Sequence, residues 1–146
     1  MLTTETTLNP KALEGLARWH ALVEQKNMDE LDALLHPDAV FRSPMAFKGY
    51  HSAPAVKLVL GTVIQVFENF TYHRSFAGDD RNSIILEFSA DVDGKSLKGI
   101  DMIRFDDDGK IVDFEVMIRP LNGLQALGAQ MGARLGHLLP AYKGAG

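Results

Sequence analysis

The sequence contains no cysteine. This absence excludes disulfide bonds, thiolate nucleophiles, iron–sulfur clusters and zinc sites built on cysteine. The five histidines show no HExxH motif or comparable ligand spacing. We therefore expect neither a metal site nor an organic cofactor.

Long apolar runs and clusters of basic residues are also missing. No apolar run reaches the roughly 20 residues of a membrane span, and residues 1–5 lack the basic region and apolar core of a signal peptide. The formal net charge is −4, whereas proteins that bind nucleic acids or anionic membranes carry basic patches. We expect a cytoplasmic protein with neither of these partners.

What remains is an ordinary globular composition. Of the 146 residues, 46% are hydrophobic and 23% are charged, as in a typical soluble domain. No internal repeat or linker interrupts the chain. The sequence predicts a single domain over residues 1–146, with flexible tails at 1–8 and 141–146.

Hydrophobic periodicity and turn residues predict alternating helical and extended segments. Asn9 and Pro10 occupy an N-cap and a first helical position, Pro37 ends a second helix, and Ser52 caps a third. Predicted helices cover residues 10–25, 28–35, 53–67 and 121–139, and predicted strands cover 38–44, 69–76, 83–92, 96–105 and 110–118.

The strongest local signal is a β-hairpin closed by the turn residues 106–109. If Asp106 faces Ile111, Asp101 pairs with Val116, and because side chains alternate between faces, one face is almost wholly apolar. That face carries Asp101, Ile103, Phe105, Val112, Phe114, Val116 and Ile118, while Arg104 and Asp113 pair on the other.

Asp101 is the single carboxylate on this apolar face. Such a group must be paired, protonated or directed into a cavity, because burying a bare charge is costly. The element order predicts an α+β fold, in which a strongly curved antiparallel sheet wraps around the N-terminal helices and leaves an apolar pocket. We expect Asp101 to point into that pocket.

The segments Ile100-Asp101-Met102-Ile103-Arg104-Phe105 and Asp108-Gly109-Lys110-Ile111 closely resemble a hairpin of bacterial ketosteroid isomerases. The similarity extends from the helix containing Trp19 to Val116, and it points to the nuclear-transport-factor-2-like superfamily, which includes SnoaL-type polyketide cyclases. The resemblance implies a cone-shaped fold with a pocket. It also implies that Asp101 stays protonated and donates a hydrogen bond to the substrate's oxyanion.

Two other positions depart from that family's pattern. The resemblance places the general base, an aspartate before a proline, at Ser43, and a hydroxyl cannot take a carbon acid's proton unaided. It places the tyrosine of the oxyanion hole at Trp19, whose indole is not an acid of comparable strength. The sequence therefore argues against steroid isomerisation by the family mechanism.

Asp101 and His20 are the candidate catalytic residues. His20 is a candidate because histidine is the usual proton shuttle, although a structural role near the helix core is as simple. The alternative for Asp101 is an ion pair or an outward orientation, and Ser43 is more simply a turn hydroxyl than a nucleophile. The residues expected to line the pocket, most of which also belong to the core, are Trp19, Phe41, Ser43, Met45, Leu86, Phe88, Ile103, Phe114 and Val116.

Two functions fit this pattern. The first is a cofactor-independent enzyme that isomerises, dehydrates, cyclises or hydrolyses a small hydrophobic molecule, with Asp101 as acid, base or hydrogen-bond donor. The second is a non-catalytic protein that binds a small hydrophobic ligand. Either is compatible with a homodimer through the outer sheet face at Ile100, Met102, Glu115 and Met117. The helix at 121–139 is then a lid, a dimer contact or simply a docked helix.

Overall fold

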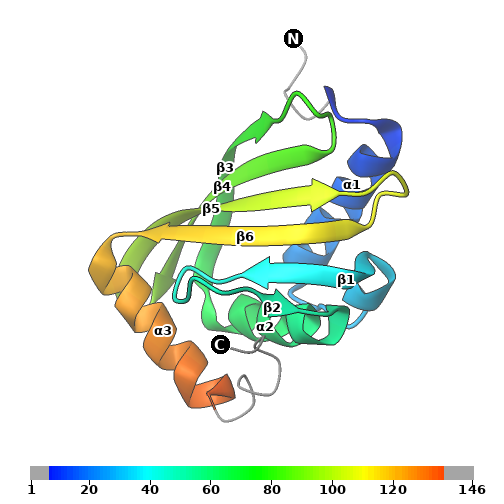
Figure 1. Ribbon diagram of the computed structural model, residues 1–146. Helices are drawn as coiled ribbons and strands as arrows, with labels where there is room; N and C mark the ends of the chain where they lie inside the picture. The colour runs from blue at the N-terminus through cyan, green and yellow to red at the C-terminus, as the bar shows by residue number, and fades with distance from the viewer. Residues whose placement is uncertain (1–6, 137–146) are drawn as a thin grey trace.

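The computed structural model describes residues 7–136, which form a curved sheet backed by helices (Figure 1). The strand order is β2-β1-β6-β5-β4-β3. In Figure 1, α1 and α2 lie behind the sheet, and α3 follows the end of β6. The elements are α1 (Pro10–Gln25), the 3₁₀ turn η2 (Leu31–Ala33), β1 (Leu35–Arg42), β2 (Tyr50–His51), α2 (Ala53–Val66), β3 (Glu68–Ala77), β4 (Ser83–Val92), β5 (Lys95–Phe105), β6 (Ile111–Arg119) and α3 (Leu121–Leu135).

The α+β class is confirmed, but the sheet is mixed rather than wholly antiparallel. β1 runs parallel to β6, whereas the other neighbouring strands are antiparallel. β1 and β6 are far apart in the sequence and no hairpin joins them, so no tight turn imposes an antiparallel arrangement. Sequence patterning alone carries no signal for this pairing.

The prediction of a helix over residues 28–35 is wrong. Only Leu31–Ala33 form a 3₁₀ turn, and Leu35 already begins β1. The backbone N–H of Ile111 donates to the Leu34 carbonyl at 2.8 Å, so the sheet takes over this segment. The register of β1 against β6 shifts between Leu35 and Val40, an irregularity that accommodates Pro37 within the strand.

Neither predicted cap acts through its side chain. Asn9 precedes α1 as expected, but its amide donates to the Asn82 Oδ1 at 2.8 Å. Ser52 precedes α2 with a φ of 96° and makes no capping hydrogen bond. A capping residue ordinarily has an extended backbone with negative φ, which explains why Ser52 does not act as one.

The central hairpin has the expected pairing at Asp101, which faces Val116 on β6. The prediction that Asp106 faces Ile111 is wrong, because Phe105 takes that place after a register shift. As a consequence, Ile111 is buried in the core.

On the outer face, the expected pair between Arg104 and Asp113 is replaced by another. The two residues face each other in the register, but the Asp113 carboxylate accepts from the Arg42 guanidinium at 3.1 Å. Val112, predicted to face the core, is only half-buried beside this pair. The parallel neighbour β1, which the sequence did not reveal, supplies the competing arginine.

The C-terminal helix, α3, is docked onto the end of the sheet. A Cβ added to Gly123 would lie 2.8 Å from Leu97 Cβ, and the Gln130 amide donates to Asp93 at 2.8 Å. Its predicted final residues, 137–139, lie outside the described residues. Of the predicted tails 1–8 and 141–146, residues 1–6 and 141–146 also lie outside the described residues, whereas Leu8 is buried.

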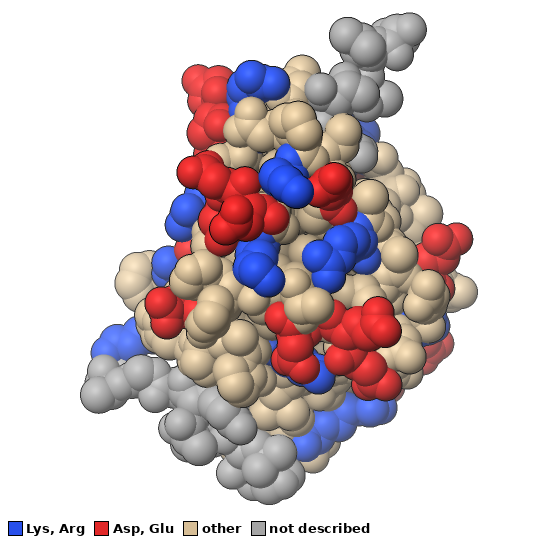
Figure 2. Space-filling model, turned by 90° about the vertical axis from the view of Figure 1, so that its right-hand side faces the viewer, with Lys and Arg blue, Asp and Glu red and all other residues tan. Residues whose placement is uncertain are grey.

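Charges are mixed over the end of the molecule at which α1 and the β5–β6 turn lie. Figure 2 shows acidic and basic side chains intermingled there without an extended basic patch. Within residues 7–136, no helix has both the length and the apolar character needed to cross a membrane.

The contact between α1 and the β5–β6 turn depends on two glycines. Gly109 has a φ of 81°, a left-handed conformation that favours glycine. A Cβ on Gly15 would collide with the carbonyl oxygen of Gly109 and would lie 2.9 Å from the Phe105 ring. By contrast, the nearest atom to a Cβ on Gly61, in α2, would be the Met28 Cβ at 3.8 Å.

We expect Gly15→Ala and Gly61→Ala to have opposite effects on stability. Alanine favours a helix over glycine by up to about 1 kcal/mol, so Gly61→Ala should raise the free energy of unfolding. At Gly15 overpacking dominates and should lower it by about 1 to 3 kcal/mol. Urea unfolding of both variants measures this, and equal effects would contradict the close approach of α1 to the turn.

Candidate active site

An apolar cavity of about 190 Å³ lies between the inner face of the sheet and the helices. It exceeds the roughly 150 Å³ of an apolar cavity that admits benzene, so it has room for a small hydrophobic molecule. Its walls are Trp19, Val23, Met28, Phe41, Ser43, Pro44, Met45, Tyr50, Val59, Leu60, Val63, Ile64, Phe67, Phe70, Tyr72, Asp101, Phe114, Val116, Ile118, Leu127, Gly128, Met131 and Gly132.

Asp101 supplies the one carboxyl group among the described residues of this wall. It lies on β5 between Leu86 of β4 and Val116 of β6, and only 5% of its surface is exposed. None of the ion pairs among residues 7–136 includes it, so the alternative of a neighbouring cation is not found there. Burial raises the pKa of the Asp101 carboxyl to about 7, because the charged form is the one that loses hydration.

A chain of hydrogen bonds supports this carboxyl group. The Trp19 indole N–H donates to the Tyr72 hydroxyl at 3.0 Å, and that hydroxyl donates to Asp101 Oδ2 at 2.6 Å. The indole can only donate, so the Tyr72 oxygen accepts from it and the single Tyr72 proton points to Asp101. The bond from Tyr72 lowers the pKa of Asp101 and partly opposes the effect of burial.

The second carboxyl oxygen of Asp101 is the one available to a ligand. Oδ1 has no hydrogen-bond partner within residues 7–136. Every fully buried polar side-chain atom in that range has a partner, so Oδ1 is not fully buried. Oδ1 is therefore accessible from the cavity that Asp101 lines. Because Oδ2 accepts from Tyr72, the proton of a neutral Asp101 resides on Oδ1 and faces the cavity.

Two tyrosines share the cavity with Asp101. Burial raises the pKa of Tyr72 well above 10, with a further contribution from the charge of Asp101, and burial also raises the pKa of Tyr50. Both hydroxyls therefore keep their protons at neutral pH. Among the described residues of the cavity wall, Asp101 is the group that changes its ionisation near pH 7.

The structure brings most of the predicted pocket residues to the cavity. Trp19, Phe41, Ser43, Met45, Phe114 and Val116 line it together with Asp101. Leu86, Phe88 and Ile103 are buried but are not among the residues that line it. Phe88, for example, is covered by Phe67 and Phe70, whose ring centroids lie 5.6 Å and 5.0 Å from its own.

His20 does not line the cavity. Its half-buried ring packs edge-on against Tyr72 with a centroid distance of 5.4 Å. His20 therefore contacts Tyr72, the middle residue of the hydrogen-bond chain, and not the space that a ligand would occupy.

The Ser43 hydroxyl belongs to a turn, and Ser43 is also one of the residues that line the cavity. Its oxygen accepts from the backbone N–H of Met45 at 3.0 Å, which leaves its own proton to donate. Arg42 of β1 pairs with Glu115 of β6, so the next residue, Ser43, lies beside Val116. Val116 also pairs with Asp101 of β5, so one strand, β6, separates Ser43 from Asp101. With strands about 4.8 Å apart, the backbones at 43 and 101 are roughly 10 Å from each other.

Sequence reasoning missed Tyr72. Phe70 and Tyr72 alternate on a predicted strand, which indicates a shared face, but it does not indicate which strand that face approaches. The register of β3 against β4 shifts twice, around Thr71 and after Tyr72. These irregularities decide that the hydroxyl reaches Asp101, and local patterning does not reveal them.

Within the described part of the chain, no group of three His, Asp or Glu side chains is arranged to hold a metal ion.

A family model and a solved structure both show similarity to this chain. A model of the SnoaL-like domain matches residues 16–114. A steroid delta-isomerase structure from Pseudomonas aeruginosa is 59% identical, covers 91% of this chain and 97% of its own, and has a TM-score of 0.87.

Two further structures share this fold at lower identity. An uncharacterized protein with a cystatin-like fold from Silicibacter pomeroyi is 32% identical, with coverage of 88% of this chain and 91% of its own and a TM-score of 0.79. A putative isomerase from Bacillus subtilis is 25% identical, with 81% and 93% coverage and a TM-score of 0.62. No match is found among curated proteins.

The raised pKa of Asp101 predicts a pH dependence of stability. Its folded pKa of about 7 exceeds the ordinary value of 3.8, so the folded state holds the proton more tightly. The stabilisation from that proton is present below pH 4 and is lost as the pH rises through 7. Between pH 5 and pH 8, the loss from this one group should be on the order of 2 to 3 kcal/mol.

Asp101→Asn removes the titration but keeps an oxygen that accepts from Tyr72. We expect urea unfolding of this variant to show less loss of stability between pH 5 and pH 8 than the unaltered protein shows. Asp107→Asn, at an exposed turn position, is the matched control and should leave the pH profile unchanged. Parallel profiles for all three proteins would contradict a neutral, buried Asp101.

Proposed function

Because this chain belongs to the SnoaL-like domain family, within the nuclear-transport-factor-2-like superfamily, we propose that it is a cofactor-independent isomerase acting on a small hydrophobic carbonyl compound. The observation that carries this proposal is a carboxyl group with a pKa of about 7 whose free oxygen faces an apolar cavity. A group that transfers protons works best when its pKa lies near the operating pH. The neighbours that are a steroid delta-isomerase and a putative isomerase support the reaction class.

In the proposed reaction, Asp101 moves the proton. Ionised Asp101 takes a proton from the carbon next to the carbonyl through Oδ1, while Tyr72 keeps its hydrogen bond to Oδ2. The electron pair left on carbon delocalises onto the carbonyl oxygen and gives an enolate. In a substrate with a β,γ carbon–carbon double bond, the neutral carboxyl then returns the same proton to the γ carbon, which brings the double bond into conjugation with the carbonyl and restores ionised Asp101.

The Ser43 hydroxyl is proposed to donate a hydrogen bond to the enolate oxygen. Its oxygen is already engaged by the N–H of Met45, so its proton is the part that it can offer to a ligand. Relative to the ketosteroid isomerase pattern, the two ends of the site exchange roles. The proton-transfer group stands at Asp101 and the hydrogen-bond donor at Ser43.

The sign of the pH–rate profile distinguishes the proposed role of Asp101 from that of a neutral hydrogen-bond donor. The assay converts the β,γ-unsaturated isomer of cyclohexenone into the conjugated ketone, followed by its ultraviolet absorbance. If Asp101 is the base, kcat should rise with pH through about 7 and then level off, because the ionised form is active. A rate that falls through the same range would assign Asp101 the donor role instead.

Variants test the two roles separately. Asp101→Asn should lower kcat by roughly 10²-fold or more while binding is retained, as is usual for loss of a proton-transfer group. Ser43→Ala should lower kcat by roughly 10²-fold, typical of a lost oxyanion donor. Tyr72→Phe removes a bond that lowers the pKa of Asp101, so it should move the midpoint of the profile to higher pH.

Asp107→Asn serves again as the control and should leave kcat unchanged. Saturable quenching of the fluorescence of Trp19, the sole tryptophan, reports binding independently of turnover. Binding of such ketones without turnover of any would favour the alternative function, a non-catalytic protein that binds small hydrophobic ligands.

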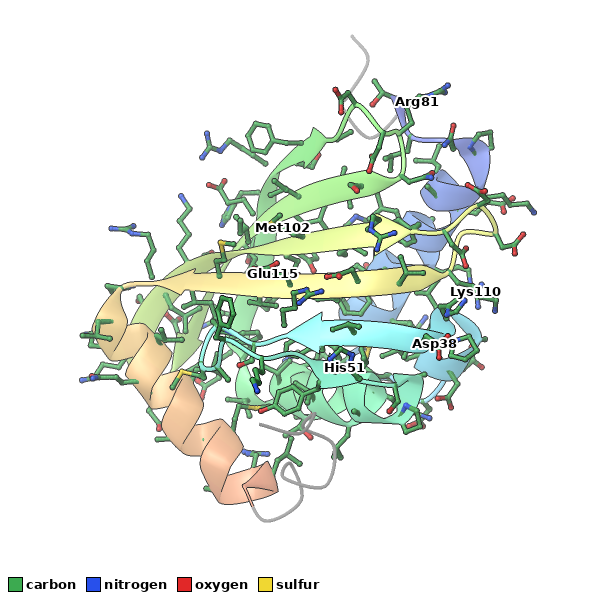
Figure 3. All side chains as sticks on the ribbon, in the orientation of Figure 1. Asp38, His51, Arg81, Met102, Lys110 and Glu115 are labelled. Atoms are coloured by element: carbon green, nitrogen blue, oxygen red, sulfur yellow. The ribbon has the colours of Figure 1, made fainter. Side chains whose placement is uncertain are left out.

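We also propose a homodimer through the outer face of the sheet. Met102 and Glu115 lie side by side there on β5 and β6 (Figure 3). Met117 is 48% exposed, and the hollows beside these residues are lined by Ile100 and by Arg104. The same hollows are also lined by the acidic residues Glu87, Asp113 and Glu115 and the basic residues Lys98, Arg104 and Arg119, so the face has charges of both signs to pair with a second copy of itself.

Met117→Glu should convert a dimer into a monomer, because it places a charge at the centre of the proposed contact. Light scattering after size-exclusion chromatography measures this at micromolar concentration. Leu13→Glu, on the exposed side of α1, is the control and should remain dimeric. A monomeric unaltered protein would overturn the dimer and leave the proposed reaction unaffected.

A further inference from the structure

Two glycines of α3 form part of the cavity wall, and they differ in what surrounds them. Gly128 packs against the loop after β1, since a Cβ there would lie 2.6 Å from Met45 Cε. Gly132 lies one turn further along the same helix face. Apart from its chain neighbours and the backbone of its own helix, no described atom lies within 4 Å of where its Cβ would be. Glycine inside a helix costs about 1 kcal/mol relative to alanine, and packing does not account for Gly132.

These residues stand at the outer end of the cavity. Gly132 is exposed and Met45 is 52% exposed, although both line the cavity. Asp101, in contrast, is almost completely buried, and one of its carboxyl oxygens has no hydrogen-bond partner among the described residues. The cavity thus has a polar anchor at a buried position and an unfilled apolar edge at the surface.

We infer that the missing side chain at Gly132 lets the apolar tail of a ligand pass out between α3 and Met45, so that the site accepts molecules longer than the enclosed cavity. The ligand class is a hydrophobic compound with its oxygen group at one end and an extended apolar body. Gly132 is then a specificity-determining residue. This inference rests on the proposed function, because it takes the polar end of the ligand to lie near Asp101.

The position of α3 in the chain agrees with this role. The SnoaL-like match ends at residue 114, and α3 begins at Leu121. The outer edge of the cavity is therefore built by an element beyond the residues that the family model matches. Leu127 and Met131, on the same helix, supply apolar surface on either side of the glycine edge.

The test measures the affinity of straight-chain methyl ketones of increasing length by quenching of Trp19 fluorescence. In the unaltered protein, each added methylene should improve binding roughly fourfold, beyond the length that the enclosed cavity holds. In Gly132→Leu the short ketones should bind as before, and the gain should stop at a shorter chain. Gly132→Ala should show a smaller shift in the same direction.

Gly61→Ala is the matched control, because it also replaces a helical glycine whose Cβ fits but which does not line the cavity. It should bind every ketone as the unaltered protein does. Identical length profiles for Gly132→Leu and the unaltered protein would overturn the inference while the proposed function stands. Equal weakening of short and long ketones would also overturn it, and no binding of any ketone by the unaltered protein would overturn both.

Discussion

The burial of one carboxyl group in an apolar sheet face is the constraint to which the rest of this structure answers. Removing a carboxylate from water is so costly that a buried one must be neutralised or hydrogen-bonded. Asp101 accepts a hydrogen bond from Tyr72, and burial raises its pKa to about 7. To maintain that bond, α1 must present Trp19, β3 must present Tyr72 and β5 must present Asp101 at one place. The same three elements form part of the cavity wall, together with β1, α2, β6 and α3.

A second carboxylate of the same sheet shows how strongly the face decides the outcome. Glu87 lies on β4, next to β5, but it points to the outer side, where Arg74 donates to it at 2.7 Å and Lys98 lies 3.4 Å away. The hydrogen bonds from Arg74 lower the pKa of Glu87 to about 2. The pKa values of two acids on adjacent strands are thus shifted in opposite directions, because Glu87 is paired with cations on the outer face and Asp101 faces hydrocarbon.

The features that sequence reasoning predicted are local ones. The inward direction of Asp101 followed from alternation along one hairpin, and its pairing with Val116 followed from the turn. The errors arose where distant segments compete. Residues 28–35 satisfy a helical pattern, yet hydrogen bonding to Ile111 draws Leu35 into the sheet. Asp113 finds Arg42 rather than Arg104, because a parallel strand lies beside it.

The candidate site divides in the same way. Asp101 was identified as an anomaly in a pattern, whereas Tyr72 belongs to a strand whose two register shifts place it. The outer edge at Gly132 was not identified, because its meaning depends on empty space rather than on a residue type. The sequence shows which chemical groups are present. Which of their atoms lack a partner can be seen only in the folded cavity wall.

The proposed chemistry follows from having a single titratable group in the wall near pH 7. One carboxyl that both removes and returns a proton must act on one face of the substrate, through the one oxygen that Tyr72 leaves free. Apolar walls slow exchange of that proton with water, so it is returned to the substrate rather than lost to solvent. The indole of Trp19 contributes without touching the proton, because a group that can only donate fixes the direction of the Tyr72 hydroxyl. The orientation of one hydroxyl thereby decides which oxygen of Asp101 reacts.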